Sequence, residues 1–483
     1  MKFYNFTIGF LTFFILAVLY NAQPSFGLHY GQLILIGKQK FKMDFNKRAV
    51  ANGIKQNPKY TKIMNKLPHS PFKPPIGDHE ETYSITFSFD NNEAKKVVAE
   101  YGLDPDRDMF QIGREIENID FTIDQKRVSR YACRIVAERE APENVYIYAA
   151  GFDNSKNIFL GVNAMKIKKP DGQFDGLVTN GVLILSPFNE PPSQEAPPIH
   201  ENAASSSHAL ESLSSRIMSP IKRIMKPLKK ISRESSPRAG RKNKSSQEST
   251  PITGKEKEVS QEIFHSTCWK EVSVTGDIYS QRKERVPGQM GKFEPSLTNK
   301  LEDGTLINLC GATLLWRSAK GLQNIDTEET LKKRLQELNK KRAQCPVYMH
   351  TLVFGRTGES STSNSNNGHS VLRKPHVYEK CGHVQSNHKW GIDNGKYKCP
   401  YCKQSSDRVI KMSLGLEPAF HLDSNAFDYA FNSCGHIASE RTVEYWSSIP
   451  IPQENGNFHA VCPFCNTLLN DDKPTIKLIL CQD

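Results

Sequence analysis

The chain has 483 residues, enough for two or three domains with complete hydrophobic cores. Its hydrophobic share of 37% is low for a folded protein but above that of a wholly disordered chain, and eleven cysteines are too few at this length for a dense disulfide scaffold. The formal net charge of +12 is local, because residues 221–244 carry ten Lys and Arg and one Glu. Residues 381–483 carry nine basic and eleven acidic residues, which excludes the basic surface typical of nucleic-acid-binding proteins at the cysteine-rich end.

Residues 1–27 contain an apolar run from Phe6 to Tyr20, preceded by one lysine. The run fits a membrane anchor or a signal peptide, although Tyr20-Asn21-Ala22 is a poor cleavage site. If it is an anchor, the basic residues between 38 and 48 favour a cytosolic location for the rest of the chain. A wrongly assigned first exon would also explain it, so three interpretations stay open.

Residues 28–320 are predicted to form one β domain. Short β-branched or aromatic runs such as GQLILIG, TYSITFSF, CRIVAE and GVLIL are separated by Asp, Asn, Gly and Pro, and no helical pattern intervenes. This arrangement predicts a mainly β fold, a sandwich. Residues 188–264 are rich in Ser, Pro, Lys and Glu and are predicted to be a disordered insertion, because strand patterns resume after them in WKEVSVTGDIYS and GTLINLCGATLLW.

Part of this insertion has a second interpretation. In RIMSPIKRIMKPLKKIS, five Ile and Leu residues fall at helical spacing opposite a basic face, a pattern that suits an anionic membrane. Pro220 and Pro227 oppose a continuous helix and favour a solvated basic linker.

One helix is predicted over residues 326–342, inside a linker of residues 321–375. Asp326 and Glu329 match a capping box, and Leu331, Leu335 and Leu338 share one helical face. The helix would join the β domain to the cysteine-rich end, residues 376–483.

The cysteine-rich end contains the same device twice, a Cys-Gly-His followed by a Cys-Pro-aromatic-Cys. Each copy offers four soft or borderline ligands, which is the number that a structural zinc ion takes. Two complete sets in the same order predict two structural zinc ions. Because ligands within one copy close the shorter loops, the favoured grouping is by copy, and a cross-braced grouping is the alternative. The favoured sets are Cys381, His383, Cys399 and Cys402, and Cys434, His436, Cys462 and Cys465.

These stretches resemble a known family. PHVYEKCGHVQSNHKW, CGHIASERTVEYWSSIPIP and FHAVCPFC resemble the RING-like region of the Pellino family of ubiquitin ligases. DMFQIGRE, SRYACRIVAERE, AAGFDNSKNIFLG and LINLCGATLLWR resemble that family's forkhead-associated domain. The resemblance implies a phosphopeptide-binding β-sandwich followed by a short helix and a zinc-stabilised RING-like domain. The connection at residues 188–264 is longer than the family's.

The resemblance also implies site residues. Arg114, Ser129, Arg130, Thr179 and Asn180 match the family's phosphothreonine pocket, where a guanidinium would give charge-assisted bonds to phosphate. A RING-like module has no catalytic nucleophile and instead orients a ubiquitin-charged conjugating enzyme.

The apolar residues around the zinc turns are candidates for docking that enzyme, with a local core as the alternative role: Ile437, Trp446, Pro463 and Phe464. RING ligases often carry a cation after the last zinc cysteine, where this chain has Asn466.

The implied function is that of a RING-type E3 ubiquitin ligase acting on phosphorylated kinases of the interleukin-1-receptor-associated type, in Toll-type innate immune signalling. Its location would be cytoplasmic, with membrane contact through residues 1–27 or the basic insertion left open. The alternative is a phosphopeptide-binding adaptor whose zinc domains are inert.

Overall fold

The computed structural model describes residues 29–38, 41–58, 60–64, 82–90, 95–187, 269–282, 289–356, 373–388, 390–453 and 456–481. The apolar run of residues 1–27 and the insertion of residues 188–264 lie outside these ranges, so the expectations for both stay predictions. Within the ranges given, no helix is long and apolar enough to cross a membrane.

We call residues 29–323 the β domain. Its largest sheet contains the first and the last strands of the domain, so the two ends of this segment meet in one sheet. The seven strands lie in the order β16 (Ile278–Ser280), β15 (Lys270–Val272), β14 (Leu183–Leu185), β17 (Leu306–Asn308), β18 (Thr313–Ser318), β1 (His29–Leu35) and β2 (Lys42–Asn46). The insertion of residues 188–264 falls between β14 and β15, which pair with each other.

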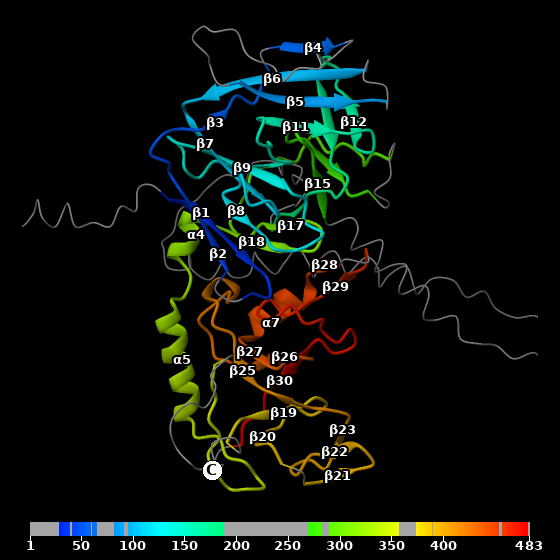
Figure 1. Cartoon of the computed structure of the whole chain (residues 1–483). Coiled ribbons are helices and arrows are strands. Elements are labelled where there is room, and N and C mark those ends of the chain that lie inside the picture. The colour runs from blue at the N-terminus through cyan, green and yellow to red at the C-terminus, as the bar shows by residue number, and fades with distance from the viewer. Residues whose placement is uncertain are drawn as a thin grey trace, which may run out of the picture.

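Three further sheets complete the β domain. A four-stranded sheet packs with the largest sheet in one core cluster. Its strands lie in the order β10 (Val145–Ala149), β9 (Cys133–Glu138), β7 (Arg107–Gly113) and β8 (Phe121–Thr122). The sheet furthest from the C-terminal end contains β11 (Asn157–Leu160), β5 (Thr82–Ser88), β6 (Lys96–Asp104) and β3 (Gly53–Ile54), with β4 (Tyr60–Met64) also paired to β6 (Figure 1). A hairpin joins β12 (Met165–Lys168) to β13 (Phe174–Leu177). One core cluster includes Leu33, Phe87 and Phe110 from the three larger sheets, as a sandwich requires.

The C-terminal domain, residues 343–481, is built from short strands around the repeated cysteine stretches. The strands of its distal part are β19 (His376–Tyr378), β20 (Val384–Gln385), β21 (Ile392–Asp393), β22 (Lys396–Lys398), β23 (Ser405–Ser406) and β24 (Val409–Lys411). Those nearer the β domain are β25 (Ser413–Leu414), β26 (Tyr429–Phe431), β27 (His436–Ala438), β28 (Ile451–Pro452), β29 (Phe458–His459) and β30 (Thr475–Lys477). A 3-10 turn, η2 (Pro418–Phe420), and the helix α7 (Glu440–Ser448) lie among them.

Two helices join the domains. The short helix α4 (Ala319–Gln323) contacts β1 and β18, whereas α5 (Glu328–Lys340) runs along the side of the C-terminal domain (Figure 1). The predicted helix is therefore present, but the predicted capping role of Asp326 is wrong. Thr327 is the N-cap and its side chain accepts from the Thr330 amide. Asp326 instead accepts a bond of 2.6 Å from Arg334.

The helix α5 is not a free spacer. Leu331, Leu335 and Leu338 pack in one cluster with Val377 and Ile437 of the C-terminal domain. The helix is therefore part of that domain's core.

The largest sheet of the β domain is buried on both faces. One face packs in the sandwich core, and the other packs in an apolar cluster that is shared with the C-terminal domain. On β1, Leu33 joins the sandwich core while its neighbour Ile34 joins the shared cluster. On β18, Leu314 and Leu315 divide in the same way. Trp446 of α7 lies in the shared cluster from the other side. Burial on both faces explains why these strands have continuous apolar runs instead of an alternating pattern.

Candidate functional site

The first Cys/His cluster contains Cys381, His383, Cys399 and Cys402. Their ligand atoms all lie within 4.8 Å of one another. The Nδ1 atom of His383 is buried and has no hydrogen-bond partner among the described residues, which suits a nitrogen that faces a metal ion. Burial also lowers the pKa of His383, which favours the neutral imidazole that binds metals.

The second cluster contains Cys434, His436, Cys462 and Cys465, within the same limit of 4.8 Å. The Nδ1 atom of His436 lies 3.4 Å from the Cys434 Sγ and 3.6 Å from the Cys462 Sγ. The structure thus groups the ligands by copy, and no group of metal-ligand type found in the described ranges combines residues of both copies.

The two clusters are formed by the same backbone turns, with matching hydrogen bonds. In the first, the Gly382 amide donates to the Tyr378 carbonyl at 2.9 Å, and the Lys403 amide donates to the Cys399 carbonyl at 2.9 Å. In the second, Gly435 donates to Phe431 at 2.9 Å and Asn466 to Cys462 at 2.8 Å. The matching turns show that the sequence repeat is also a structural repeat.

Each cluster is closed by a strand from the other copy. The segment after the first Cys-Pro-x-Cys continues into β25, which pairs in parallel with β27 at the second cluster. The segment after the second Cys-Pro-x-Cys forms β30 and then bridges His383 through Ile479. Gly382 has φ +78, and a Cβ there would lie 2.1 Å from the Lys477 carbonyl oxygen of this exchanged segment. Only glycine fits at this crossing.

The donor set fits zinc. Three thiols and one imidazole per cluster are the ligands of a closed tetrahedral site. Burial raises the pKa of Cys381 to about 12 and raises that of Cys462 well above its ordinary value. The pKa of one thiol in each cluster, Cys402 and Cys465, is instead lowered, by hydrogen bonds from its neighbours. A bound cation would convert the thiols of raised pKa to thiolates and release their protons. His388, by contrast, bonds Gln385 at 2.7 Å, and His459 belongs to neither cluster.

The four candidates for conjugating-enzyme docking are buried, which favours the alternative role, a local core. Ile437 and Phe464 are 0% and 1% exposed because they pack inside the C-terminal domain. Trp446 is 1% exposed and its Nε1 donates to the Phe420 carbonyl at 3.0 Å. Pro463 is buried, and its carbonyl accepts from the Gly37 amide of the β domain at 2.8 Å.

The residues of the predicted phosphate pocket come together at one end of the β domain. Ser129, Arg130, Thr179 and Asn180 line a hollow of about 650 Å³. Asn180 Nδ2 donates to the Ser129 Oγ at 3.1 Å, which joins two loops that are 51 residues apart. Arg114 borders the hollow without lining it: its amide donates to the Ser129 carbonyl and its Nε to the Val128 carbonyl, both at 3.0 Å.

The hollow has an apolar side that sequence reasoning missed. Phe159 and Val162 line it and are 56% and 39% exposed. Their positions in and after β11 gave a signal, because the strand alternates buried and exposed residues and puts an aromatic on the exposed side. The arrangement combines exposed cations with an exposed apolar wall, which suits a phosphorylated peptide better than free phosphate.

Comparison with family models covers both domains. The model described as "Pellino, FHA domain" matches residues 27–217 and 252–334. The model described as "Pellino, RING domain" matches residues 338–483.

Curated relatives match almost the whole chain. The Homo sapiens protein named "E3 ubiquitin-protein ligase pellino homolog 2" is 34% identical over 490 residues, which cover 95% of this chain and 96% of the relative. "Protein pellino" of Drosophila melanogaster is 35% identical over 94% of this chain and 93% of its own length. "E3 ubiquitin-protein ligase pellino homolog 3" of Mus musculus is 32% identical over 94% and 89%.

Proposed function

Because this chain belongs to the Pellino family, in which relatives are named E3 ubiquitin-protein ligases, we propose that it is a RING-type ubiquitin ligase directed by phosphorylation. One observation carries the proposal: a single chain holds two closed Cys/His clusters in one domain and a cation-bordered hollow in the other. The first suits a structural metal module and the second suits recognition of a phosphorylated segment.

We propose that both clusters bind zinc and that the zinc is structural. Four protein ligands per ion leave no position for a reactive water, so the metal would hold the fold rather than take part in chemistry. The ligands would be Cys381, His383, Cys399 and Cys402 for one ion and Cys434, His436, Cys462 and Cys465 for the other.

The contribution of such a module to ubiquitin transfer is orientation. It would hold a ubiquitin-charged conjugating enzyme so that a substrate lysine can attack the thioester, with no covalent intermediate on the ligase itself. The residues of the chain therefore bind and position partners.

The phosphate pocket would select the substrate. Arg114 and Arg130 would supply charge to a phosphothreonine, while Ser129, Thr179 and Asn180 would add hydroxyl and amide groups at short range. The resemblance to the family makes phosphorylated kinases of the interleukin-1-receptor-associated type our proposed substrates, in Toll-type innate immune signalling.

The domain assignment follows from these roles. We assign residues 28–320 to phosphopeptide binding, 376–483 to the RING-like module and 321–375 to the connection. The reaction would take place in the cytoplasm. All ten cysteines that the structure describes are free thiols, which agrees with a reducing compartment.

Burial of all four docking candidates favours a second function, that of a phosphopeptide-binding adaptor without ligase activity. Autoubiquitination in vitro with a panel of conjugating enzymes separates the two. The ligase proposal predicts zinc-dependent ubiquitin chains with at least one conjugating enzyme. A folded, zinc-loaded protein that is inactive with every one of them would favour the adaptor.

A further inference from the structure

We propose that the contact between the two domains is autoinhibitory, because the β domain covers the surface of the C-terminal domain on which a conjugating enzyme would dock. The inference rests on the proposed ligase function and adds its regulation. We place this surface at the second Cys-Pro-x-Cys turn and at α7, because the docking candidates Pro463 and Trp446 lie there. The Ile449–Pro452 segment and η2 adjoin it. In Figure 1, α7, β28 and β29 lie at the end of the C-terminal domain that faces the β domain.

Donors from the β domain occupy the backbone carbonyls of this surface. The Trp269 Nε1 donates to the Pro450 carbonyl at 2.6 Å, and the Gly37 amide donates to the Pro463 carbonyl at 2.8 Å. The Arg317 guanidinium donates to the Ala419 carbonyl of η2 at 3.3 Å. Each of these carbonyls is an acceptor that water or another protein could use after release, so no buried polar group would stay unpaired.

The turn after β1, at Ile36 and Gly37, contacts the second Cys-Pro-x-Cys turn. Gly37 has φ +83, and a Cβ at this residue would lie 2.4 Å from the Cβ of Asn466, the residue that follows the last zinc cysteine. The two backbones therefore touch at the second Cys-Pro-x-Cys turn. Residues 36–37 therefore cover the Pro463 side of this turn, whereas Asn466 and Leu468 stay exposed.

The equivalent turn of the first cluster is more exposed than the turn of the second. There the aromatic residue is Tyr401, which is 42% exposed, whereas its counterpart Phe464 is 1% exposed. Lys403 follows the last cysteine in the first copy, in the position of Asn466 in the second. Phe464 packs on Phe420, Phe431 and His436 of its own domain. The β domain covers the backbone of this turn, where the Gly37 amide donates to the Pro463 carbonyl.

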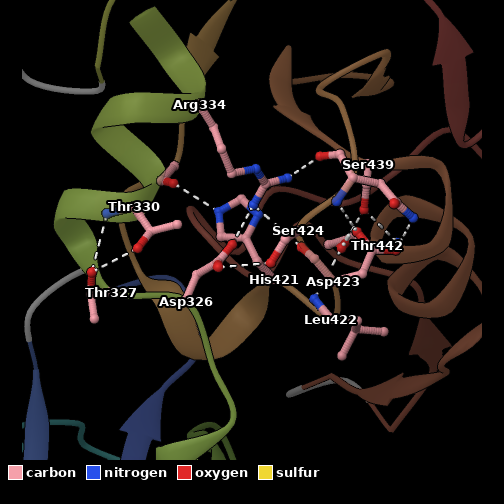
Figure 2. A network of polar contacts seen from close by, with 12 residues as sticks. Asp326, Thr327, Thr330, Arg334, His421, Leu422, Asp423, Ser424, Ser439 and Thr442 are labelled. Atoms are coloured by element: carbon pink, nitrogen blue, oxygen red, sulfur yellow. Dashed lines mark hydrogen bonds and ion pairs between the residues drawn. The ribbon is translucent and has the colours of Figure 1, made fainter. Parts of the chain in front are cut away.

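The connection between the domains allows release. The helix α4 contacts strands of the β domain, while α5 packs in the core of the C-terminal domain. Figure 2 shows how the start of α5 is fixed: Asp326 accepts from Arg334 at 2.6 Å and from the Ser424 hydroxyl at 2.8 Å. Only Asn324 and Ile325 lie between the two anchored parts, so a rotation there would separate the domains. The separation would leave the sandwich core and the α5 core intact and would expose the apolar cluster that the two domains share, on which Ile325 also packs.

One ion pair crosses the interface and offers a specific test. Lys42 of β2 lies 2.9 Å from Glu417, whose side chain is 2% exposed, whereas Lys42 is 34% exposed. Lys42→Glu would put two carboxylates together at a buried position and favour separation. The substitution lies in the β domain, so the docking surface itself stays chemically unchanged.

The experiment measures discharge of ubiquitin from charged conjugating enzymes to free lysine by the full chain. While the closed form predominates, the rate should rise in proportion to the open fraction, and we expect an increase of about tenfold for Lys42→Glu. Ile36→Asp, which places a charge in the same contact, should also raise the rate. Lys42→Arg should resemble the wild type, as should Lys47→Glu, which lies near β2 and pairs with Glu140 of the β domain. A gain of activity cannot result from misfolding of the C-terminal domain, and unchanged phosphopeptide affinity would show that the β domain stays folded.

The outcomes separate this inference from the proposed function. An active wild type with no gain in either variant would overturn autoinhibition and leave the ligase proposal standing, with the exposed first cluster as the docking place. No activity from any of these proteins with any conjugating enzyme would overturn both.

Hydrogen exchange gives a second measurement. Addition of a charged conjugating enzyme should increase exchange at the Gly37 amide, whose hydrogen bond to Pro463 exists only in the closed form. Ubiquitin discharge by a wild type whose Gly37 amide stays equally protected would contradict the inference.

Discussion

The Arg114 side chain stands exposed after β7, and among the described residues its guanidinium bonds only the Val128 carbonyl, through Nε. Its terminal N–H groups can therefore reach a phosphate. Arg114→Ala should weaken binding of a phosphothreonine peptide by about 10- to 100-fold, the loss of one or two charge-assisted hydrogen bonds. Fluorescence anisotropy with a labelled peptide measures this. Arg107→Ala, at the other end of β7, is the matched control, and equal affinities of the two variants would place the pocket elsewhere.

His421 makes the stability of the C-terminal domain depend on pH. Burial lowers its pKa to about 4, its Nε2 lies 3.1 Å from the Gly415 carbonyl, and its Nδ1 has no hydrogen-bond partner within the described ranges. The folded state therefore holds fewer protons on this histidine than the unfolded state, whose pKa is near 6.5. Stability must fall as the pH drops from about 6.5 towards about 4.

The prediction concerns the difference between wild type and His421→Phe. The wild type should lose about 2 kcal/mol relative to the variant between pH 7 and pH 5, because the pKa of His421 is about 4 in the folded state and near 6.5 in the unfolded state. Urea unfolding at both pH values measures this, and the zinc ligands cancel because both proteins share them. Parallel pH profiles would show that His421 is not buried in neutral form.

The structure brings together most of the residues that the sequence predicted for the two candidate sites, whereas their surroundings were not predicted. Metal-ligand spacing is a property of short segments, so the eight ligands could be read without the fold. The burial of four docking candidates could not be predicted, because it depends on which distant segments pack on them: Ile437, Trp446, Pro463 and Phe464. For the same reason the apolar wall at Phe159 was missed.

The exchanged strands make the two zinc sites one folding unit. β25 follows the first Cys-Pro-x-Cys turn and pairs beside the second cluster, while β30 and Ile479 return to the first. Loss of one site should therefore release the strand that closes the other, since metal binding and folding share one free energy here.

Cys399→Ser tests this coupling. The variant should hold clearly less than one zinc ion per chain, because the second site loses its neighbouring strand. Zinc released by a thiol reagent and detected with a chromogenic chelator measures the stoichiometry, against two ions in the wild type. Retention of one tightly bound ion would show that the sites fold independently.

The local sequence predicted some of the helices and strands but not their exact ends or their pairing. The apolar spacing predicted the helix α5, but the helix begins at Glu328 after the N-cap Thr327. Asp326 does not cap it, because its carboxylate accepts a hydrogen bond from Arg334. Such competition between a cap and a tertiary ion pair is not visible in sequence. The pairing of β25 with β27 was likewise unpredictable, because both strands are only two or three residues long.

The whole molecule is held together by a sheet that is buried on both faces. The continuous apolar runs of β1, β14, β17 and β18 carried a signal for this, because an outer face exposed to water would alternate. The identity of the covering domain could not be predicted. The shared cluster fixes the distance between the phosphate pocket and the zinc module in the closed form. The two domains could change their relative orientation only after they separate by a rotation at residues 324–325.

In the whole molecule, phosphopeptide binding and ubiquitin transfer should be separable. The β domain would raise the effective concentration of a phosphorylated substrate near the charged conjugating enzyme. Arg114→Ala should therefore spare autoubiquitination and lose transfer to the substrate. A variant that loses both to the same extent would mean that the pocket does not act through substrate capture.

The most direct test of a zinc-dependent ligase is Cys462→Ser. Cys462 is buried in the second cluster, so its loss opens a zinc site without touching the phosphate pocket. Ubiquitin transfer by the full chain, both to itself and to a phosphothreonine substrate, would be measured beside phosphopeptide affinity. The account predicts that transfer to every acceptor is lost while phosphopeptide affinity is unchanged. Full transfer activity in Cys462→Ser would contradict it.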